Sequence, residues 1–262
     1  GEYYLTDVVE LAQRQNVAID YVLAPHHYEV LGVNNKLQLE QLERFYQIIQ
    51  ANKLLEAGVT LFDKRRIDIR GSLSAGSDCS IDVNCIFEGV VKLGNNVQIG
   101  AGCHLKNVTI ANNVTIKAYS LLDDSVVADG AQIGPFARLR PGSSLAENSH
   151  VGNFVEIKNS SLGIGSKVNH LTYIGDALIG NKVNVGAGSI TCNYDGKNKF
   201  KTIIGNNVFI GSGTMMVAPV KINDGSLIGA GSVITHDTPE NELTLARAKQ
   251  VTVSGWHKSN KK

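Results

Sequence analysis

The chain has 262 residues, a formal net charge of +1, 27 glycines and only 6% aromatic residues. A charge this close to zero offers no electrostatic attraction to nucleic acid or to an anionic membrane surface. No run of 18 apolar residues could span a bilayer, and the acidic residues Glu2, Asp7 and Glu10 do not fit the start of a signal peptide. We therefore expect a cytoplasmic protein that binds neither nucleic acid nor membranes.

Residues 1–66 lack the repeat that fills most of the chain. Thr6 can cap a helix that runs to about Gln15, and residues 17–24, rich in β-branched side chains, favour a strand. Residues 28–33 favour a second, short extended segment. About 60 residues with one or two strands bury too little apolar surface to fold as an independent α/β domain.

A long helix is predicted next. Its apolar residues recur at helical spacing up to Gly58, a natural C-terminal stop. The residues that define this apolar face are Leu37, Leu42, Tyr46, Ile49 and Leu54. We expect the helix to link the N-terminal segment to the repeats.

A six-residue phrase recurs from about Ile69 to Ile234: an aliphatic residue, often a glycine, two variable positions and a small residue. Clear copies begin at Leu93, Ile99, Ile133, Val151 and Val185. This period fits neither an α-helix nor a strand paired with its sequence neighbour, so it predicts a parallel β-helix whose short faces stack coil on coil. The aliphatic side chains should point inward. The small fifth residues should occupy tight corners: Val97, Cys103, Ala137, Ser143, Val155, Ser166, Ser189, Thr214 and Ser232.

The four cysteines, Cys79, Cys85, Cys103 and Cys192, show no C-x-x-C spacing. Cys85 and Cys103 occupy inward hexapeptide positions, so structural thiols are favoured over a metal site or a disulfide. A covalent role for Cys192 would need a neighbouring base or cation to lower its pKa, and the adjacent sequence shows no such arrangement.

The six-residue period breaks between Ile190 and Ile203. The inserted residues 192–201 are polar and basic and contain a turn-forming Asp195-Gly196 pair. Long loops held by a rigid scaffold often carry function, so we expect this loop to belong to a binding site.

Five motifs occur in order along the chain: Glu2-Tyr3-Tyr4-Leu5-Thr6-Asp7, Gly32-Val33-Asn34-Asn35, Gly134-Pro135-Phe136-Ala137-Arg138-Leu139-Arg140, His170-Leu171-Thr172-Tyr173 and Cys192-Asn193-Tyr194-Asp195-Gly196. With them the chain closely resembles the bacterial bifunctional N-acetylglucosamine-1-phosphate uridyltransferases and glucosamine-1-phosphate acetyltransferases. The resemblance implies a mainly β fold: a left-handed parallel β-helix of hexapeptide repeats, preceded by a small α/β remnant and a long helix. It further implies a remnant of a Rossmann-like nucleotidyltransferase domain in residues 1–35, a linker helix in 36–66, and an acetyltransferase domain with a C-terminal tail in 67–262.

The resemblance also bears on the uridyltransferase site. The family's glycine-rich nucleotide loop and its magnesium-binding aspartate would precede Gly1, so we expect a truncated form without uridyltransferase activity. Asn34 matches the family's other Mg²⁺ ligand, and we expect this site to be empty.

Acetyl transfer to an amine requires a base, because only the unprotonated amine attacks a thioester. A neutral imidazole suits this role near neutral pH, and His170 stands at an outward hexapeptide position. The resemblance implies that His170 is the general base, that Glu156 orients it through a hydrogen bond, and that the Ala187 N–H stabilises the oxyanion.

The remaining site residues also come from the resemblance. Guanidinium and ammonium groups suit a sugar phosphate. The substrate residues implied are Arg140, Lys158, Tyr173, Asn184 and Lys199, with Arg138 a less certain neighbour. The residues implied to bind acetyl-CoA are Ala187, Asn193, Tyr194, Ser212, Ala230 and Arg247. Ser212 and Ala230 are 18 residues apart, one full coil, and should stack.

The resemblance implies transfer of the acetyl group of acetyl-CoA to glucosamine-1-phosphate, a step toward UDP-N-acetylglucosamine for peptidoglycan and lipopolysaccharide. It also implies a homotrimer in which residues 193–199 complete a neighbouring site. The alternatives left open are a hexapeptide acetyltransferase for another amino sugar or for serine, and a noncatalytic solenoid. A β-helical carbonic anhydrase would need converging histidines, whereas His104, His150 and His170 are widely spaced.

Overall fold

The computed structural model describes residue 2 and residues 4–256, so residues 1, 3 and 257–262, including the end of the predicted tail, lie outside the description. The chain divides into two compact units, Gly1–Tyr46 and Gln47–Lys262. No helix within the described residues is both long enough and apolar enough to cross a bilayer.

The N-terminal unit is helical where it is regular. It contains α1 (Asp7–Arg14), the 3₁₀ helix η1 (His27–Val30) and the start of α2 (Lys36–Glu56). The predicted helix near Gln15 is confirmed, but the predicted Thr6 cap is wrong. Thr6 has helical backbone angles and no side-chain capping bond, and the Asp7 carboxylate instead accepts the Tyr4 N–H at 2.9 Å.

The strand predicted at residues 17–24 is wrong, as is the extended segment at 28–33, where η1 forms. A strand needs a partner for its backbone groups, and the described part of this unit contains no other strand. The β-branched residues of 17–24 are therefore exposed; Val22, for example, is 96% exposed. The described residues before α2 thus contain no strand, whereas an α/β remnant was expected.

Helix α2 begins and ends as its sequence predicts. The Asn35 side chain accepts the Gln38 N–H at 2.9 Å, which is an N-terminal cap. At the other end Gly58 adopts φ +90°, and the Gly58 and Val59 N–H groups bond to Leu55 and Leu54 carbonyls, as in a Schellman motif.

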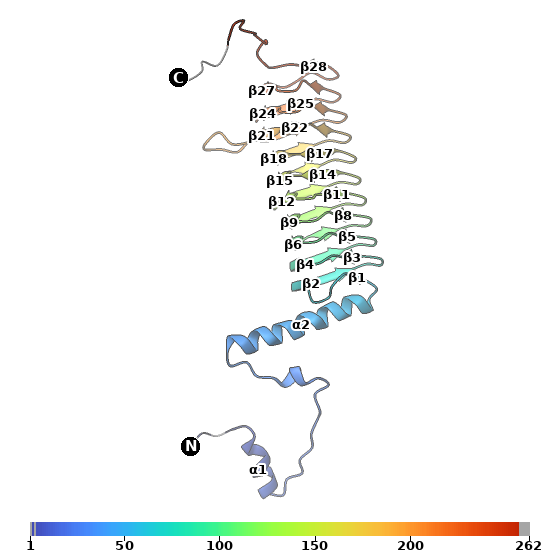
Figure 1. The fold of residues 1–262 in the computed structure, drawn as a ribbon, viewed down its shortest axis with the longest axis vertical. Helices are drawn as coiled ribbons and strands as arrows, with labels where there is room; N and C mark the ends of the chain where they lie inside the picture. The colour runs from blue at the N-terminus through green and yellow to red at the C-terminus, as the bar shows by residue number, and fades with distance from the viewer. Residues whose placement is uncertain (1, 3, 257–262) are drawn as a thin grey trace. The chain divides into compact units, whose positions relative to one another are not determined.

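The second unit is a stack of coils with parallel strands (Figure 1). One face is a sheet of β1 Thr60–Leu61, β3 Ser80–Ile81, β5 Gln98–Ile99, β8 Thr115–Ile116, β11 Gln132–Ile133, β14 His150–Asn153, β17 Lys167–His170, β20 Asn184–Val185, β23 Phe209–Ile210, β26 Leu227–Ile228 and β28 Leu243–Thr244. The other two faces share β2 Ile67–Ala75, β4 Cys85–Leu93, β6 His104–Lys106, β7 Thr109–Ile110, β9 Leu121–Asp123, β10 Ser125–Val127, β12 Arg138–Leu139, β13 Ser143–Leu145, β15 Glu156–Lys158, β16 Ser161–Leu162, β18 Tyr173–Gly175, β19 Ala177–Ile179, β21 Ile190–Cys192, β22 Thr202–Ile204, β24 Met215–Val217, β25 Val220–Ile222 and β27 Val233–Ile234.

The core of the stack follows the hexapeptide period. Aliphatic residues such as Ile99, Ile133 and Val151 are buried inside the coils, and all nine of the predicted small corner residues are buried as well. Hydroxyls at these corners bond to nearby carbonyls; Ser143 Oγ, for example, lies 2.6 Å from the Arg140 oxygen. The predicted parallel β-helix is therefore the architecture of this unit.

The first coil is closed by the C-terminal half of α2. Gln47 is only 3% exposed, and its side-chain amide donates to the Ile69 carbonyl at 2.9 Å and accepts the Ile69 N–H at 2.7 Å. These two bonds satisfy backbone groups that would otherwise be bare at the end of the stack.

We expect Gln47→Ala to lower the free energy of unfolding of this unit by about 1–3 kcal/mol, because it leaves the Ile69 N–H and carbonyl without their partner. Denaturant unfolding measures the loss. Gln41→Ala, an exposed glutamine of the same helix, is the matched control and should change stability little. If both substitutions changed the free energy of unfolding equally, the two bonds between Gln47 and Ile69 would make no measurable contribution to stability.

Candidate active site

The predicted base and three of the predicted acetyl-CoA residues form one column on the stack. Val168 pairs with Val185, Val185 with Ile210, and Ile210 with Ile228. Two residues further along each strand, this register aligns a column of His170, Ala187, Ser212 and Ala230. The stacking predicted for Ser212 and Ala230 is confirmed.

Backbone hydrogen bonds hold this column together. Gly188 N–H donates to the His170 oxygen at 3.2 Å, Gly213 N–H to the Ala187 oxygen at 2.8 Å, and Gly231 N–H to the Ser212 oxygen at 2.8 Å. Within the described residues the Ala187 N–H has no acceptor, so this donor is available beside the column. At the Ala230 end of the column, Arg247 Nη1 donates to the Ala230 oxygen at 2.8 Å. The guanidinium group of Arg247 therefore lies against the last residue of the column.

The residue that follows each column position forms a corner of the coil, and its type changes after Leu171. Up to the His170 coil this corner carries a large side chain with positive φ, and all four are exposed: Tyr119, Phe136, Phe154 and Leu171. The three aromatic rings stack with centroids 5.3 and 5.4 Å apart. Bulky residues are rare in this left-handed region. In the next three coils the same corner carries Gly188, Gly213 and Gly231.

Steric crowding does not require a glycine at any of these three positions. A Cβ on Gly188 or Gly213 would meet no atom closer than 3.9 Å, and one on Gly231 would meet none within 4 Å. The corner beside Ala187, Ser212 and Ala230 is therefore bare backbone, where the preceding coils carry large side chains.

His170 is the exposed last residue of β17, so its predicted outward position is confirmed. Its Nδ1 lies 2.6 Å from Oδ1 of Asn153, the last residue of β14 and its direct register partner. Sequence reasoning missed Asn153. The signal was present, since Asn153 precedes His170 by one 17-residue coil.

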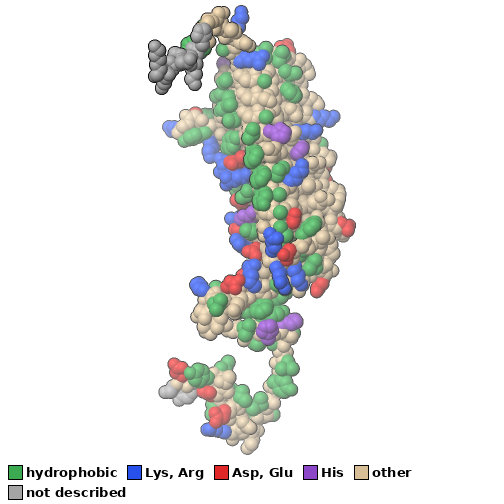
Figure 2. Space-filling view, viewed as in Figure 1, with side chains coloured by type: hydrophobic (Ala, Val, Ile, Leu, Met, Phe, Trp, Pro, Cys, Tyr) green, Lys and Arg blue, Asp and Glu red, His purple; other side chains and the backbone are tan. Residues whose placement is uncertain are grey.

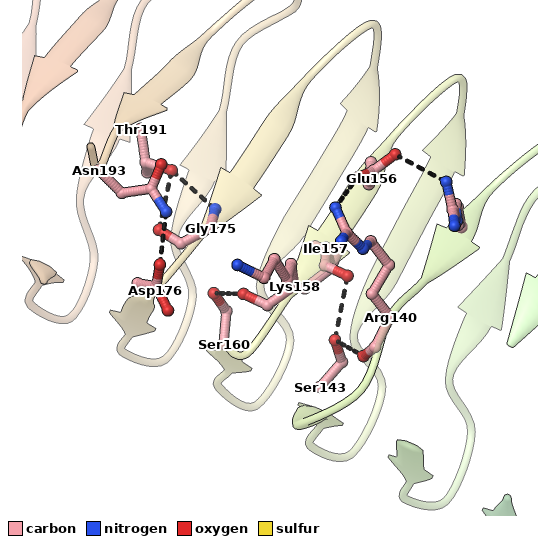
Figure 3. A network of polar contacts seen from close by, with 11 residues as sticks. Arg140, Ser143, Glu156, Ile157, Lys158, Ser160, Gly175, Asp176, Thr191 and Asn193 are labelled. Atoms are coloured by element: carbon pink, nitrogen blue, oxygen red, sulfur yellow. Dashed lines mark hydrogen bonds and ion pairs between the residues drawn. The ribbon is translucent and has the colours of Figure 1, made fainter. Parts of the chain in front are cut away.

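The structure does not bring Glu156 to His170, contrary to the orienting bond expected. The Glu156 carboxylate accepts from Arg140 at 2.8 Å and pairs with Arg138 at 3.7 Å (Figure 3). Two guanidinium groups, from the first residue of β12 and from the residue that follows this strand, bind this carboxylate, and charge-assisted bonds of this kind are stronger than bonds between neutral groups. The bond to Glu156 also raises the pKa of Arg140.

The predicted phosphate-binding cations lie together on neighbouring strands. Leu139 pairs with Ile157, so Arg140 and Lys158 are adjacent, and Lys158 pairs in turn with Gly175. The Tyr173 side chain covers Gly175, as shown by the 2.4 Å that would separate a Cβ on this glycine from the tyrosine oxygen. In Figure 2 basic side chains gather on the surface just below the protruding loop.

Arg140 also borders a shallow cavity of about 210 Å³. Its other polar walls are Arg138, Lys106, His104, Glu88 and Asp123. Asn184 lies elsewhere, on β20 of the face that carries His170, and is half-buried. The structure thus brings Arg140, Lys158 and Tyr173 together and places Asn184 on the adjoining face.

The inserted loop protrudes from the stack beside β21 (Figure 1). It is internally ordered: Tyr194 and Lys199 form an antiparallel bridge, and Asp195 Oδ1 accepts the N–H groups of Lys197 and Asn198 at 2.8 and 2.6 Å. These bonds lower the pKa of Asp195. Tyr194 is 59% exposed at the loop, so its ring has little contact with its own coil.

The base of this loop is fixed to the coil by Asp176. One carboxylate oxygen accepts from Asn193 at 2.5 Å (Figure 3). The other accepts from Asn159 at 2.6 Å. Burial acts to raise the pKa of Asp176, but these bonds and the charges of Lys158 and Lys199 outweigh it, so the pKa lies below its usual value. Because Asn193 is only 8% exposed, little of its side chain is available to a cofactor.

All four cysteines are free thiols. Cys79, Cys85 and Cys103 are buried, and burial raises the pKa of the half-buried Cys192 thiol. A raised pKa disfavours the thiolate that a covalent acyl-enzyme route needs.

We therefore expect Cys192→Ala to retain most of the acetyl-transfer rate. The measurement is steady-state kinetics, together with intact-mass analysis of the wild-type chain after exposure to acetyl-CoA. An acetylated chain that passes its acetyl group to an acceptor after acetyl-CoA is removed would contradict direct transfer.

Within residues 2 and 4–256, no three His, Cys, Asp or Glu side chains come close enough together to hold a metal ion. Asn34 is exposed, and its N–H donates to Gln38 Oε1 at 2.7 Å.

Comparisons with known proteins agree with this architecture. Residues 69–145 match the GMPPB C-terminal domain, and residues 201–236 match the bacterial transferase hexapeptide (six repeats). The chain is 63% identical over 262 residues to the bifunctional protein GlmU of Chromobacterium violaceum and 54% identical to that of Nitrosospira multiformis. The resemblance to bifunctional GlmU proteins is confirmed. The match covers 100% of this chain but only 58% and 57% of those two GlmU proteins.

A solved structure supports the fold alone. The UDP-N-acetylglucosamine acyltransferase LpxA of Bacteroides fragilis is 19% identical to this chain with a TM-score of 0.50, over 68% of each chain. The predicted left-handed parallel β-helix of hexapeptide repeats is confirmed as the fold class.

Proposed function

We propose that this chain transfers the acetyl group of acetyl-CoA to the amine of glucosamine-1-phosphate, as the acetyltransferase part of a GlmU protein. The observation that carries the proposal is the column that starts at an exposed histidine and continues through Ala187, Ser212 and Ala230, with a bare glycine corner beside it. The cations Arg140 and Lys158 lie on the adjoining strands.

In this proposal each end of the column has a separate task. The unprotonated amine nitrogen attacks the thioester carbon, and His170 takes a proton from that nitrogen as the C–N bond forms. The Ala187 N–H donates to the oxyanion, and as the C–S bond breaks the protonated His170 returns the proton to the CoA sulfur. The pantetheine arm lies along Ala187, Ser212 and Ala230, and Arg247 meets the phosphate end of the cofactor.

The acceptor is bound by charge. Arg140 and Lys158 hold the sugar phosphate through charge-assisted bonds, while Tyr173 and Asn184 contact the sugar. The carboxylate of Glu156 fixes the Arg140 guanidinium, so its role here is to position Arg140 instead of His170. Acceptors without a phosphate cannot form these charge-assisted bonds and should be poor substrates.

We also propose a homotrimer whose sites are shared between chains. The protruding hairpin of residues 194–199 supports this proposal, because it is internally bonded and fixed at its base by Asp176, yet Tyr194 has little contact with its own coil. A neighbouring chain would supply that contact, with Tyr194 meeting acetyl-CoA and Lys199 the phosphate, while Asn193 holds the base of the hairpin. Closed cyclic symmetry is the common outcome for homo-oligomers. Since both substrates are soluble metabolites, we propose the cytoplasm as its compartment.

An acceptor panel tests the proposed function. CoA release is measured with glucosamine-1-phosphate, glucosamine and serine at equal concentrations, and we expect the phosphorylated sugar to dominate. Comparable rates with glucosamine or serine would instead favour the alternative acetyltransferases. A parallel reaction with UTP, Mg²⁺ and N-acetylglucosamine-1-phosphate should form no UDP-sugar.

A further inference from the structure

The contact between Asn153 and His170 bears on the protonation of the imidazole ring as well as on its orientation. The two residues end adjacent strands in direct register, and Asn153 Oδ1 lies 2.6 Å from His170 Nδ1. An amide oxygen only accepts hydrogen bonds, so a proton must stand on Nδ1. Neutral imidazole carries one proton, and Nε2 then presents a free lone pair.

We propose that Asn153 is a positioning residue that selects the Nδ1–H tautomer of His170 and aims Nε2 at the acceptor amine. The inference rests on the proposed function for its catalytic meaning, but the tautomer itself is a property of the free protein. A histidine with its proton on Nε2 could not accept the amine proton at that atom.

The surroundings leave this role to Asn153. Glu156, the other candidate, is held by Arg138 and Arg140. Burial, followed by the charges of Lys117, Lys167 and His170, lowers the pKa of His150 on β14. The Lys117 and Lys167 side chains can only donate, whereas Nδ1–H needs an acceptor.

A neutral amide also has a chemical advantage over a carboxylate. A carboxylate beside Nδ1 would stabilise the imidazolium, and His170 would then be protonated over a wider pH range. An amide orients the ring without adding a charge. This reasoning predicts different outcomes for two substitutions at the same position.

The experiment compares Asn153→Leu and Asn153→Asp in the whole chain. Leucine removes the acceptor, and we expect kcat to fall about 10- to 100-fold with little change in KM for acetyl-CoA, as for other groups that orient a functional histidine. Aspartate keeps an acceptor, so kcat at its optimum should stay within several-fold of the wild type, while the acid limb of the pH profile moves to higher pH. Gln132→Leu on β11, the next coil, is the matched control and should change neither quantity.

Long-range ¹H–¹⁵N NMR of the free chain provides the second readout, with His170→Ala used to assign the signal. We expect a protonated Nδ1 in the wild type and in Asn153→Asp, and a gain of the Nε2–H form in Asn153→Leu. An Nε2–H tautomer in the wild type, or an unchanged tautomer and rate in Asn153→Leu, would overturn the proposal. The NMR result does not need activity, so an Nδ1–H signal in a chain that acetylates no acceptor would contradict the proposed function alone.

Discussion

Replacing His170 with alanine should lower turnover by roughly 10²- to 10⁴-fold, the range usual for a positioned general base. The side chain is exposed at the head of the column, and its removal leaves the backbone bonds of that column in place. The KM for acetyl-CoA should therefore change little. Steady-state kinetics of CoA release with glucosamine-1-phosphate separates the two quantities.

The matched control for this variant is Lys167→Ala, an exposed residue of the same strand. We expect its turnover to stay within about two-fold of the wild type, as is usual for surface substitutions away from a site. If His170→Ala keeps the full rate, another group takes the amine proton and the column is not the reaction centre.

Two inactive variants should restore activity when their chains are mixed. If the hairpin reaches a neighbouring site, then chains with His170→Ala and chains with Tyr194→Ala are each poor enzymes alone. In mixed trimers a site is intact when His170 comes from one chain and Tyr194 from the next. Random mixing of equal amounts makes about a quarter of the sites intact, so about a quarter of the wild-type rate should return.

The control pair for complementation is His170→Ala with Lys158→Ala. Both residues belong to the coil side of the proposed interface, so no exchange of chains can rebuild a complete site from them. Mass spectrometry of differently labelled chains verifies that exchange has occurred. If the His170 and Tyr194 variants stay inactive after exchange, or if a monomer is fully active, the shared site is wrong.

The fold could be predicted because its signal is local and repeated. Each inward aliphatic residue and small corner residue recurs every six positions, so the register of one coil sets the next. The strand predicted at residues 17–24 failed for the opposite reason. β-branched residues favour a strand only where another strand is present to pair with it, and the described N-terminal unit offers none.

The site was partly accessible from sequence. The stacking of Ser212 on Ala230 follows from coil length alone. The partner of Glu156 could not be predicted from coil length, because it depends on which of several side chains across neighbouring strands competes best for one carboxylate. Asn153 could have been found by counting back 17 residues from His170, whereas the anchoring of Asn193 by Asp176 requires the path of the loop itself.

The most direct measurement of the central claim is the fate of a labelled acetyl group. The chain is incubated with acetyl-CoA carrying ¹³C in the acetyl carbonyl and with glucosamine-1-phosphate, and the products are followed by ¹³C and ³¹P NMR. The account predicts that the label moves to an amide carbonyl on the sugar phosphate, with no acetylated protein at any time. A chain that leaves the label on CoA, or carries it on its own residues, would contradict it.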